Sequence, residues 1–539
     1  MSPWSYARTW EAIAADVPDR EAVVTGGGCR LTYRDLDTRA DRLAHVLAAH
    51  GVGRGDAVAI SLANRPEYLE AFFAASKLGA VPANVNYQYV AAEIAHVVRD
   101  CAAAALVFHA DATDEVLAAV TGLDPAPRLL LAVGGDASTP VLAYERALAD
   151  APAGRPPRDR APDGDDRILL YTGGTTGRPK GVLWRAEDYY LQGWEAARPG
   201  TTPPDPGEAM RAGKRAATLL PASPLVHATA LGLATATLNG GGTVVLRDAT
   251  RLDPVALWDL VAREQVAVLG IVGETFAAPL LAVLDAEPGR FDLGALRAIV
   301  SSGMIFTATS KQRFHDLLPG IAIVDTLGAS EALITRSTFA GDGDAPPTSF
   351  NRSENVRVLG DDGRDVVPGS GDDGVLAVAG RLPLGYLNDP VATARMFREV
   401  DGRRYATPGD RARVLADGRI ELLGRGSACI NTGGEKVYPE EVEAVLRDHP
   451  AIADAAVVGV PDARWGEMVV ALVRVRDGDG EADGDGEGMA ASIADHCRDR
   501  LAGYKRPKQV HTVDAIEHTV AGKPDYRRLR ERAAALVAG

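Results

Sequence analysis

The sequence predicts a protein of the α/β class, with a large N-terminal α/β domain that includes a β-rich subdomain, and a small, mobile C-terminal α+β domain. Three observations support this prediction. The chain has 539 residues, more than the roughly 250 to 300 residues that one hydrophobic core organises. Short apolar runs alternate with helix-like segments through about residue 325. The pattern then changes twice, near residue 355 and near residue 426.

Strands and helices are expected to alternate through the N-terminal domain, an order typical of parallel sheets. The first predicted elements are a strand at 57–62, a helix at 66–78, a helix at 89–101 and a strand at 104–109. A connector rich in Pro, Asp and Arg leads into a strand at 167–171. The pattern resumes in apolar runs around Leu219, Val244, Val268 and Ile299.

The C-terminal third of the chain has a different pattern. Gly-Asp turns separate short β segments between residues 355 and 423, including strands at 374–379 and 419–423. The elements predicted beyond Gly426 are a helix at 440–447, strands at 455–460 and 469–475, and a helix at 489–501. We therefore expect two domains, residues 1–426 and 427–539, with a hinge near Ser427.

Composition excludes several classes of partner and location. The formal net charge of −15 disfavours nucleic acid, whose phosphate backbone requires clustered Lys and Arg. The four cysteines form no CxxC pair, which is typical of a reducing cytoplasm rather than a disulfide framework or a zinc site. We find no export signal and no window of about 20 apolar residues, so we expect a cytoplasmic protein without a membrane span. The acidic run at 477–488 lacks the final Glu of a calcium loop and is interpreted as a solvated loop.

A loop rich in Gly and Thr follows the predicted strand at 167–171. It reads Thr-Gly-Gly-Thr-Thr-Gly-Arg-Pro-Lys-Gly over residues 172–181. Its glycines let backbone N–H groups approach phosphate oxygens, its threonine hydroxyls add donors, and Lys180 supplies positive charge. It is not a Walker A motif, because Arg178 and Pro179 separate the last Gly from the Lys. Taken alone, the loop is compatible with a phosphate site or with a plain hairpin turn.

Further motifs follow in an order that resembles one known family. The loop at 172–181 is similar to the phosphate loop of the superfamily of acyl-CoA synthetases, firefly luciferases and peptide-synthetase adenylation domains. The other matching segments lie at 219–227, 327–331, 385–386, 405–410, 424–425 and 522–523, so the resemblance covers nearly the whole chain. The amino-acid sequence at residues 433–441 is most similar to that of actinobacterial ligases for fatty, steroid-derived or terpenoid acids. That analogy suggests natural-product biosynthesis or steroid catabolism.

The resemblance implies a site for ATP and the acyl-adenylate, with Mg²⁺ as a further cofactor. The residues expected to contact the nucleotide are Thr172, Gly173, Gly174, Thr175, Thr176, Gly177, Lys180, Thr326, Leu327, Gly328, Ala329, Ser330, Asp410 and Arg425. Asp410 and Arg425 suit the ribose, because a carboxylate accepts from hydroxyls and a guanidinium donates to them. Glu331 and Thr172 are expected to hold Mg²⁺ against phosphate oxygens. A turn Asp, a surface Arg and a Glu at a helix N-terminus are the plain alternatives.

The resemblance also implies where the acid binds. His227 is expected beside the acyl carboxylate, and a satisfied core His is the plain alternative. The residues expected to shape the acyl pocket are His227, Gly273, Phe276, Gly303 and Met304. Lys523 is expected to bridge the carboxylate and the α-phosphate as negative charge shifts in the transition state. Catalysis is thus assigned to Thr172, His227, Glu331 and Lys523.

A second face of the small domain is expected to serve CoA. Gly433 and Gly434 would give clearance for the pantetheine arm, and Lys436 would approach the CoA phosphates, whereas a plain β-turn is the alternative. In this family the small domain rotates, presenting Lys523 for adenylation and the 433–436 face for thioester formation. A hinge needs backbone freedom rather than a particular side chain, so Ser427 is compatible with that role.

Three departures from the family pattern keep more than one function open. Leu327 replaces an aromatic residue that lies against adenine, Pro408 replaces a Thr, and residues 301–306 place bulk near the expected acyl and adenine pocket. Stacking of a base on an aromatic ring contributes about 1 to 3 kcal/mol, so the loss of that ring would weaken nucleotide binding, and the departures are concentrated on the ATP half-reaction. The first hypothesis is an AMP-forming acyl-CoA ligase for a bulky or hydrophobic acid, using ATP, CoA and Mg²⁺. The alternatives are an enzyme that converts an acyl-adenylate supplied by a partner enzyme, and a noncatalytic adenylate- or acyl-binding protein. A homodimer is a further option.

Overall fold

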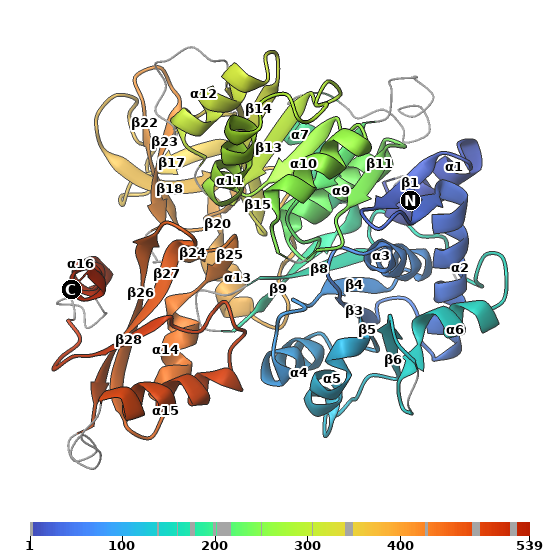
Figure 1. The fold of residues 1–539 in the computed structure, drawn as a ribbon, viewed down its shortest axis with the longest axis horizontal. Coiled ribbons are helices and arrows are strands. Elements are labelled where there is room, and N and C mark those ends of the chain that lie inside the picture. Colours follow the sequence, from blue (N-terminus) through green and yellow to red (C-terminus); the bar gives the residue numbers. More distant parts are fainter. Residues whose placement is uncertain are drawn as a thin grey trace.

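The structure is a computed structural model that describes residues 4–136, 139–158, 160–172, 178–197, 201, 217–249, 251–303, 306–339, 349–425, 429–476, 486–517 and 525–538. Figure 1 shows a large body formed by the first four fifths of the chain and a smaller one formed by the C-terminal residues. A gap in the described residues at 426–428 separates the last strand of the large body from the first strand of the small one.

Two mainly parallel sheets form the centre of the large body. The first has the strand order β15-β14-β13-β12-β10-β11-β1-β2 and is parallel except at its two edges, β14·β15 and β1·β2. Its strands are β1 (Glu21–Thr25), β2 (Arg30–Thr32), β10 (Thr218–Pro221), β11 (Thr243–Leu246), β12 (Val268–Ile271), β13 (Ala298–Ser302), β14 (Ala322–Ala329) and β15 (Ala332–Phe339).

The second sheet has the order β19-β9-β8-β4-β3-β5-β6-β7. It is parallel from β8 to β7, and β9 is antiparallel to both of its neighbours. Its strands are β3 (Ala57–Ser61), β4 (Val81–Asn84), β5 (Ala105–His109), β6 (Leu129–Val133), β7 (Leu142–Ala143), β8 (Arg167–Thr172), β9 (Lys180–Arg185) and β19 (Gly385–Tyr386).

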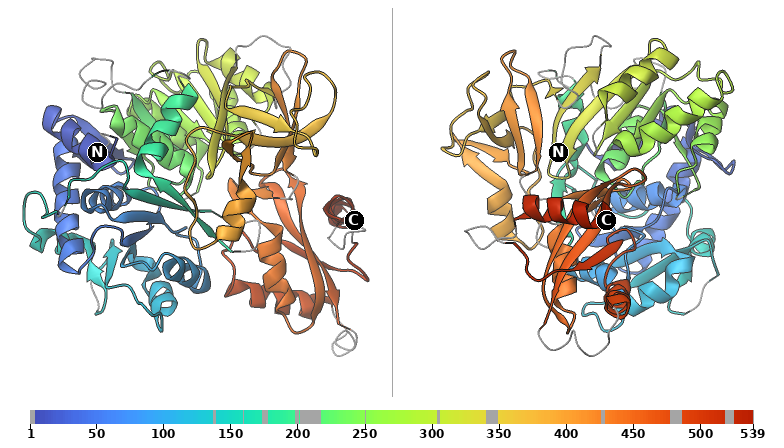
Figure 2. Two further views of the ribbon diagram at one scale, coloured as in Figure 1. Left: turned by 180° about the vertical axis from the view of Figure 1, so that it is seen from behind. Right: turned by 60° about the vertical axis from the view of Figure 1, so that its left-hand side comes forward.

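Helices fill the space between the two sheets and cover their outer faces (Figure 2). One apolar cluster joins both sheets to the inner helices, and it includes Trp10, Phe72 and Leu231. The inner helices are α1 (Tyr6–Asp16), α2 (Tyr33–Ala49), α3 (Pro66–Leu78), α6 (Tyr144–Asp150), α7 (Ala186–Ala197) and α9 (Ala228–Asn239). The outer helices are α10 (Pro254–Arg263), α11 (Gly273–Ala286) and α12 (Ala308–Leu317) on the first sheet, and α4 (Ala91–Asp100) and α5 (Thr113–Val120) on the second.

A smaller, mainly antiparallel sheet follows and carries α13 (Pro390–Met396). Its order is β16-β23-β22-β18-β21-β20, with β17 paired to β18. The strands are β16 (Ser349–Phe350), β17 (Val356–Leu359), β18 (Asp373–Val378), β20 (Phe397–Val400), β21 (Arg403–Ala406), β22 (Asp410–Val414) and β23 (Ile420–Arg425). This is the β-rich subdomain that the sequence predicts.

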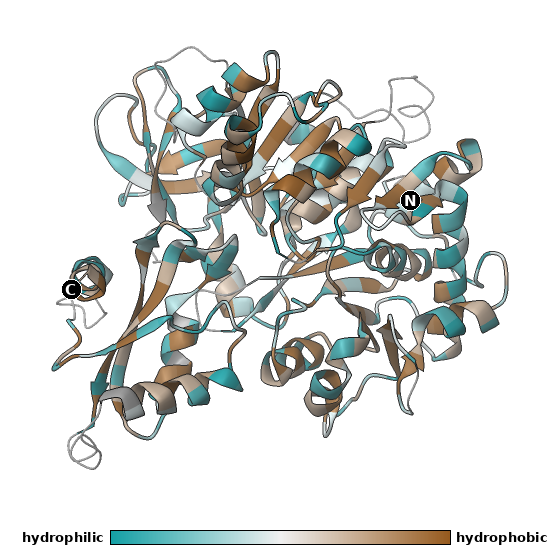
Figure 3. Ribbon diagram, viewed as in Figure 1, coloured by the Kyte–Doolittle hydropathy of each residue, from teal (hydrophilic) through white to brown (hydrophobic). Residues whose placement is uncertain are grey.

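The C-terminal body is a sheet covered on both faces. Its order is β25-β24-β27-β26, with β28 parallel to β27. Its elements are β24 (Ile430–Thr432), β25 (Glu435–Val437), α14 (Pro439–Arg447), β26 (Ile452–Asp462), β27 (Gly466–Val475), α15 (Gly486–Arg498), β28 (Gln509–Thr512) and α16 (Tyr526–Ala538). Val457 packs toward α14 and α15 and its neighbour Val458 toward α16, because successive side chains of a strand point to opposite faces. Both faces of this sheet therefore require apolar residues, as Figure 3 shows for its strands.

The predicted fold class is confirmed. The predicted strands at 57–62, 104–109 and 167–171 correspond to β3, β5 and β8, and the predicted helix at 66–78 is α3. The helix expected at 489–501 begins and ends three residues earlier, at Gly486 and Arg498. The predicted hinge at Ser427 and most of the acidic run at 477–488 lie outside the described residues. In the part of the chain that is described, no helix is long and apolar enough to cross a membrane.

Candidate active site

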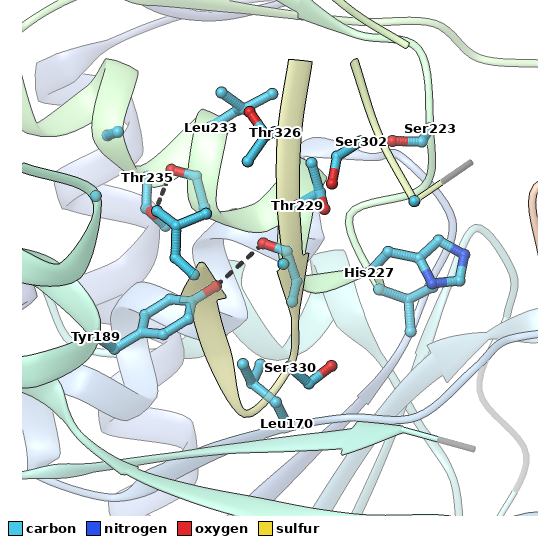
Figure 4. A pocket seen from close by; sticks show the side chains of 18 of the residues that line it. Leu170, Tyr189, Ser223, His227, Thr229, Leu233, Thr235, Ser302, Thr326 and Ser330 are labelled. Atoms are coloured by element: carbon cyan, nitrogen blue, oxygen red, sulfur yellow. Dashed lines mark hydrogen bonds between the residues drawn. The ribbon is translucent and has the colours of Figure 1, made fainter. Parts of the chain in front are cut away.

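A cavity of about 690 Å³ lies where parallel strands of both sheets end, beside α9. Crevices at the carboxyl ends of parallel strands are the usual ligand sites of open α/β sheets. Figure 4 shows side chains converging on the cavity from these elements. The walls include Leu170 and Thr172 from β8, Thr229 and Leu233 from α9, Ser302 from β13 and Thr326 from β14. Polar groups thus share the cavity with apolar ones.

Asn84, at the end of β4, joins two segments of the cavity wall. Its side-chain amide donates to the carbonyl oxygen of Tyr171 at 3.0 Å and to that of Val226 at 2.7 Å, and its oxygen accepts from the Tyr171 N–H. One buried side chain therefore connects β8, the strand before the loop rich in Gly and Thr, to the turn before His227. Asn84 belongs to none of the motifs that the sequence analysis singled out.

Glu331 lies in the tight turn between β14 and β15, where Ala329 pairs with Ala332. It is not at a helix N-terminus, which was the plain alternative. The side chain is buried, and its Oε1 accepts a hydrogen bond of 2.6 Å from the hydroxyl of Tyr386. Tyr386 comes from β19, so the Gly-Tyr motif of the sequence supports the orientation of the acidic residue.

Lys180 is the first residue of β9, directly opposite Thr172 in the β8–β9 hairpin. Its ammonium lies 3.3 Å from Oδ2 of Asp389 and 5.3 Å from the centre of the Tyr386 ring. The N–H of Ala392 and the Lys180 charge hold the pKa of Asp389 below its ordinary value. Tyr386 thus links Lys180, from the end of the loop rich in Gly and Thr, to Glu331. Asp389 had no signal in the motif pattern.

His227 is the residue before α9, and its Nε2 lies 3.2 Å from Oε1 of Glu435 in β25. This contact joins the large body to the C-terminal body. Burial disfavours the charged imidazole, but the Glu435 carboxylate outweighs that effect and raises the pKa of His227. The plain alternative, that His227 is a core side chain with its hydrogen bonds satisfied, does not fit, because the side chain is 33% exposed and lines the cavity. Glu435 is the partner that sequence reasoning missed.

The glycine pair of the C-terminal body meets the large body at the same place. Gly434 has a φ of +89°, and a Cβ there would lie 3.7 Å from Phe276 and 3.8 Å from Val272. Gly433 has a φ of +60°, and a Cβ there would lie 3.2 Å from the ring of Trp465. The left-handed backbone at both positions therefore favours glycine, and Gly434 lies beside Phe276 and Val272 of the large body.

Thr326 carries a buried hydroxyl that has no hydrogen-bond partner among the described residues. Buried polar atoms are nearly always paired, so an orphaned group on a cavity wall indicates a ligand or a water. Thr326 thus fits a site that is completed by a bound molecule.

The predicted site residues fall into three groups. Ten line the cavity: Thr172, His227, Gly303, Thr326, Gly328, Ala329, Ser330, Glu331, Gly434 and Lys436. Others lie off its wall: Lys180, Gly273, Phe276, Leu327, Asp410 and Gly433. Outside the described residues are Gly173, Gly174, Thr175, Thr176, Gly177, Met304, Ser427, Lys523 and the side chain of Arg425.

Two residues of the second group have informative positions. Leu327 packs against the core of the β-rich subdomain instead of facing the cavity, because its strand neighbour Thr326 occupies the cavity side. Asp410 is buried at the start of β22, and its backbone is the pairing partner of Arg425 in β23. The two residues expected at the ribose are thus neighbours in adjacent strands.

Comparisons with known proteins cover nearly the whole chain. The family model of AMP-binding enzymes matches residues 10–387, and that of the AMP-binding enzyme C-terminal domain matches residues 441–523. The 3-oxocholest-4-en-26-oate–CoA ligase of Rhodococcus rhodochrous is 39% identical over 535 residues, covering 96% of this chain and 93% of that protein. The medium-chain acyl-CoA ligase Mig of Mycobacterium avium is 37% identical, covering 97% of each. The structure of the amide bond synthetase McbA from Marinactinospora thermotolerans superposes with a TM-score of 0.79 at 27% identity, covering 98% of this chain and 99% of that one.

These matches agree with the ordered motifs of the sequence, with the α/β architecture and with the cavity at the strand ends. They also support the predicted class, an AMP-forming acid–CoA ligase that uses ATP and CoA. The chain belongs to the family of AMP-binding enzymes.

Proposed function

We propose that this protein converts a bulky, hydrophobic carboxylic acid into its CoA thioester, carrying out both half-reactions on one chain. The observation that carries this proposal is the cavity, which meets Thr172 and Glu331 of the large body and Gly434, Glu435 and Lys436 of the small one. One continuous cavity thus gives a single bound acyl group access to the nucleotide motifs and to the face expected to bind CoA.

Adenylation belongs to the end of the cavity near Thr172. The acid's carboxylate oxygen attacks the α-phosphorus of ATP, and pyrophosphate leaves. Lys180 and the predicted Lys523 supply positive charge for the phosphates and for the developing transition state. Lys180 is paired with Asp389 here and would exchange that partner for a phosphate.

Magnesium fits the residues present at this end. Mg²⁺ is usually held by one or two carboxylates together with substrate phosphates and water, and Glu331 is a buried carboxylate on the cavity wall. Glu331 and the Thr172 hydroxyl are the groups that would hold the ion. When bound, it would neutralise charge on the triphosphate.

Thioester formation belongs to the end near His227. The sulfur of CoA attacks the acyl-adenylate carbonyl, the thiol proton is released, and AMP leaves. Glu435 orients His227 and favours its protonated form, so the ring can stabilise negative charge on the reacting carbonyl oxygen. Gly434 leaves the clearance that a narrow pantetheine arm needs, and Lys436 lies beside it.

The class of acid follows from the cavity and the relatives together. Its volume lies within the roughly 300 to 1,000 Å³ typical of sites that bury drug-sized molecules, and Leu170, Leu233, Val268 and Tyr189 give it apolar surface. The similar ligases are named for 3-oxocholest-4-en-26-oate and for medium-chain acids. A steroid side-chain acid or a medium- to long-chain fatty acid is therefore the substrate class we propose.

The test is to measure the half-reactions separately. The chain is incubated with ATP and Mg²⁺ against medium-chain, long-chain and steroid side-chain acids, and pyrophosphate release is followed without CoA. CoA is then added, and the thioester is identified by mass. We expect pyrophosphate release with at least one of these acids and its thioester once CoA is present.

The other outcomes separate the competing hypotheses. No pyrophosphate release, together with conversion of a supplied acyl-adenylate to the thioester, would favour the partial enzyme that Leu327 suggested. Failure of both reactions across the panel would leave a noncatalytic binding protein.

A further inference from the structure

Lys505 is a buried lysine between the two bodies that the proposed chemistry does not use. It lies between α15 and β28 and is 1% exposed. Its ammonium lies 2.6 Å from Oε1 of Glu93, in α4 of the large body, and 2.6 Å from Oε1 of Glu441, in α14 of the small body. Burial disfavours the ammonium, but Tyr89, Glu441 and Glu93 outweigh it and raise the pKa of Lys505. The charged side chain thus ties the two bodies together.

The large body holds its side of this contact rigidly. The other carboxylate oxygen of Glu93 accepts from the N–H of Val90 at the start of α4, at 3.1 Å. The Tyr89 ring lies 4.5 Å from the Lys505 ammonium. Ala502 packs into the apolar cluster that covers the outer face of the second sheet. The segment around Lys505 is therefore docked by charge, by an aromatic ring and by apolar contact.

In the small body, the docked helix α14 and the active-site strand β25 are close together in the sequence. Glu441 is in the first turn of α14, which begins two residues after β25 ends. β25 carries Glu435, the partner of His227. Fixing the first turn of α14 against α4 therefore limits where Glu435 can lie.

Two of the polar contacts between the bodies, His227 with Glu435 and Lys505 with its two carboxylates, differ in burial. His227 and Glu435 share one bond of 3.2 Å, and the imidazole is one-third exposed. Lys505 has two carboxylate partners, and all three side chains are at most 6% exposed. Removing one member of a buried ion pair leaves an uncompensated charge, whereas an exposed pair is readily replaced by water. The contact of Lys505 with Glu93 and Glu441 is thus able to hold Glu435 beside His227.

We propose that Lys505 is a positioning residue for thioester formation, acting through Glu93 and Glu441 to place Glu435 against His227. The inference rests on the proposed function and names a residue of the same site. Lys505 does not itself line the cavity, and its ammonium lies 4.5 Å from the ring of Tyr89, which does. Its loss should therefore slow the step that needs the 433–436 face and leave pyrophosphate release nearly unchanged.

The test uses full-length Lys505→Met and Glu93→Gln, with Arg498→Met as the matched control. Arg498 is an exposed cation of the same body whose side-chain partner is Asp495 in its own helix. Glu93→Gln leaves the ion pair of Lys505 and Glu441, which has no net charge, within the small body, so that body should still fold. We expect both test variants to form thioester from a supplied acyl-adenylate and CoA roughly tenfold more slowly, with pyrophosphate release within about twofold of the parent.

A second readout does not depend on turnover. Small-angle X-ray scattering of the ligand-free full chain should give a larger radius of gyration for both test variants than for the parent and the control. Equal losses in the two half-reactions, or unchanged thioester formation in Glu93→Gln, would overturn the positioning role. If the parent itself turns over no acid, the proposed function fails, and an unchanged radius of gyration in both variants would still refute the docking.

Discussion

The two ends of the cavity are built in different ways. At the end proposed to bind the nucleotide, Thr172, Lys180, Glu331 and Tyr386 all belong to the large body and lie on hairpins or edge strands of its two sheets. At the other end, Glu435 and Gly434 come from the small body and reach His227 and Phe276 across an interface. The first end depends on local strand pairing, whereas the second depends on how one body docks on the other. Changes at one end should therefore affect one half-reaction more than the other.

The largest effect is expected for Lys523→Ala. A lysine that bridges the carboxylate and the α-phosphate stabilises charge mainly in the transition state, so pyrophosphate release should fall by roughly 10² to 10³-fold. Thioester formation from a supplied acyl-adenylate should be nearly unchanged. Parallel assays of the two half-reactions measure this, and full pyrophosphate release by the variant would remove the catalytic assignment of Lys523.

Glu331→Gln should have the next largest effect, again at the nucleotide end. The amide keeps the shape and can still accept from Tyr386 but loses the negative charge that suits Mg²⁺, so pyrophosphate release should fall by about 10- to 100-fold. Raising the Mg²⁺ concentration should restore part of the rate. Tyr386→Phe is the matched control, because it removes the hydroxyl and leaves the carboxylate, and it should cost less. A rate that does not respond to Mg²⁺ in Glu331→Gln would argue against a metal role.

Gly434→Ala should impair the thioester step, at the end of the cavity near His227. The φ of +89° disfavours any L side chain, whereas the added Cβ would be at ordinary van der Waals distance from Phe276, so the strain is in the backbone conformation. A strained residue of this kind costs about 1 to 2 kcal/mol, which predicts roughly a tenfold loss in the thioester step. The measurement is the KM for CoA and the rate with a supplied acyl-adenylate. Gly503→Ala, at a site with open space in the same body, is the control and should behave as the parent does.

Glu435→Gln should lower the pKa of His227, because the carboxylate that favours the imidazolium is removed while burial remains. In the parent, the raised pKa means that this contact contributes stability fully at pH below the unfolded value of about 6.5. The contribution is lost as pH rises through the higher folded value. Histidine side-chain NMR, with His227→Asn to assign the signal, measures the shift. An unchanged or higher pKa in Glu435→Gln would contradict the contact.

The smallest effect is expected for Thr326→Val, which replaces an unpartnered buried hydroxyl by a methyl group of similar size. The free energy of unfolding should be unchanged or rise by up to about 1 kcal/mol, because a buried polar group without a partner is removed. Thermal unfolding with and without the preferred acid measures it. A marked loss of stability in the ligand-free variant would show that the hydroxyl has a partner within the protein.

Local patterns predicted most of the elements because each one depends on nearby residues. The strand at 57–62 is a run of mainly apolar residues, and the helix at 66–78 has Pro66 at its start and Gly79 in the left-handed conformation at its end. The predicted boundaries were less accurate for α15, whose start lies three residues before the predicted one. Motif order predicted the family, and with it ten of the residues on the cavity wall.

The sequence by itself determined the chemistry: the order of Gly-, Thr-, Glu- and Lys-containing motifs, each set by residues next to one another, is sufficient for the family. Only the tertiary structure decided the partnerships between them. Glu435 lies 208 positions from His227, and Lys505 lies 412 positions from Glu93. A carboxylate near a lysine in space leaves no trace in a local pattern, because the pairing depends on how two separately folded bodies dock. The side of β14 that Leu327 faces could likewise not be predicted from the sequence, because it depends on the packing of the β-rich subdomain against this strand.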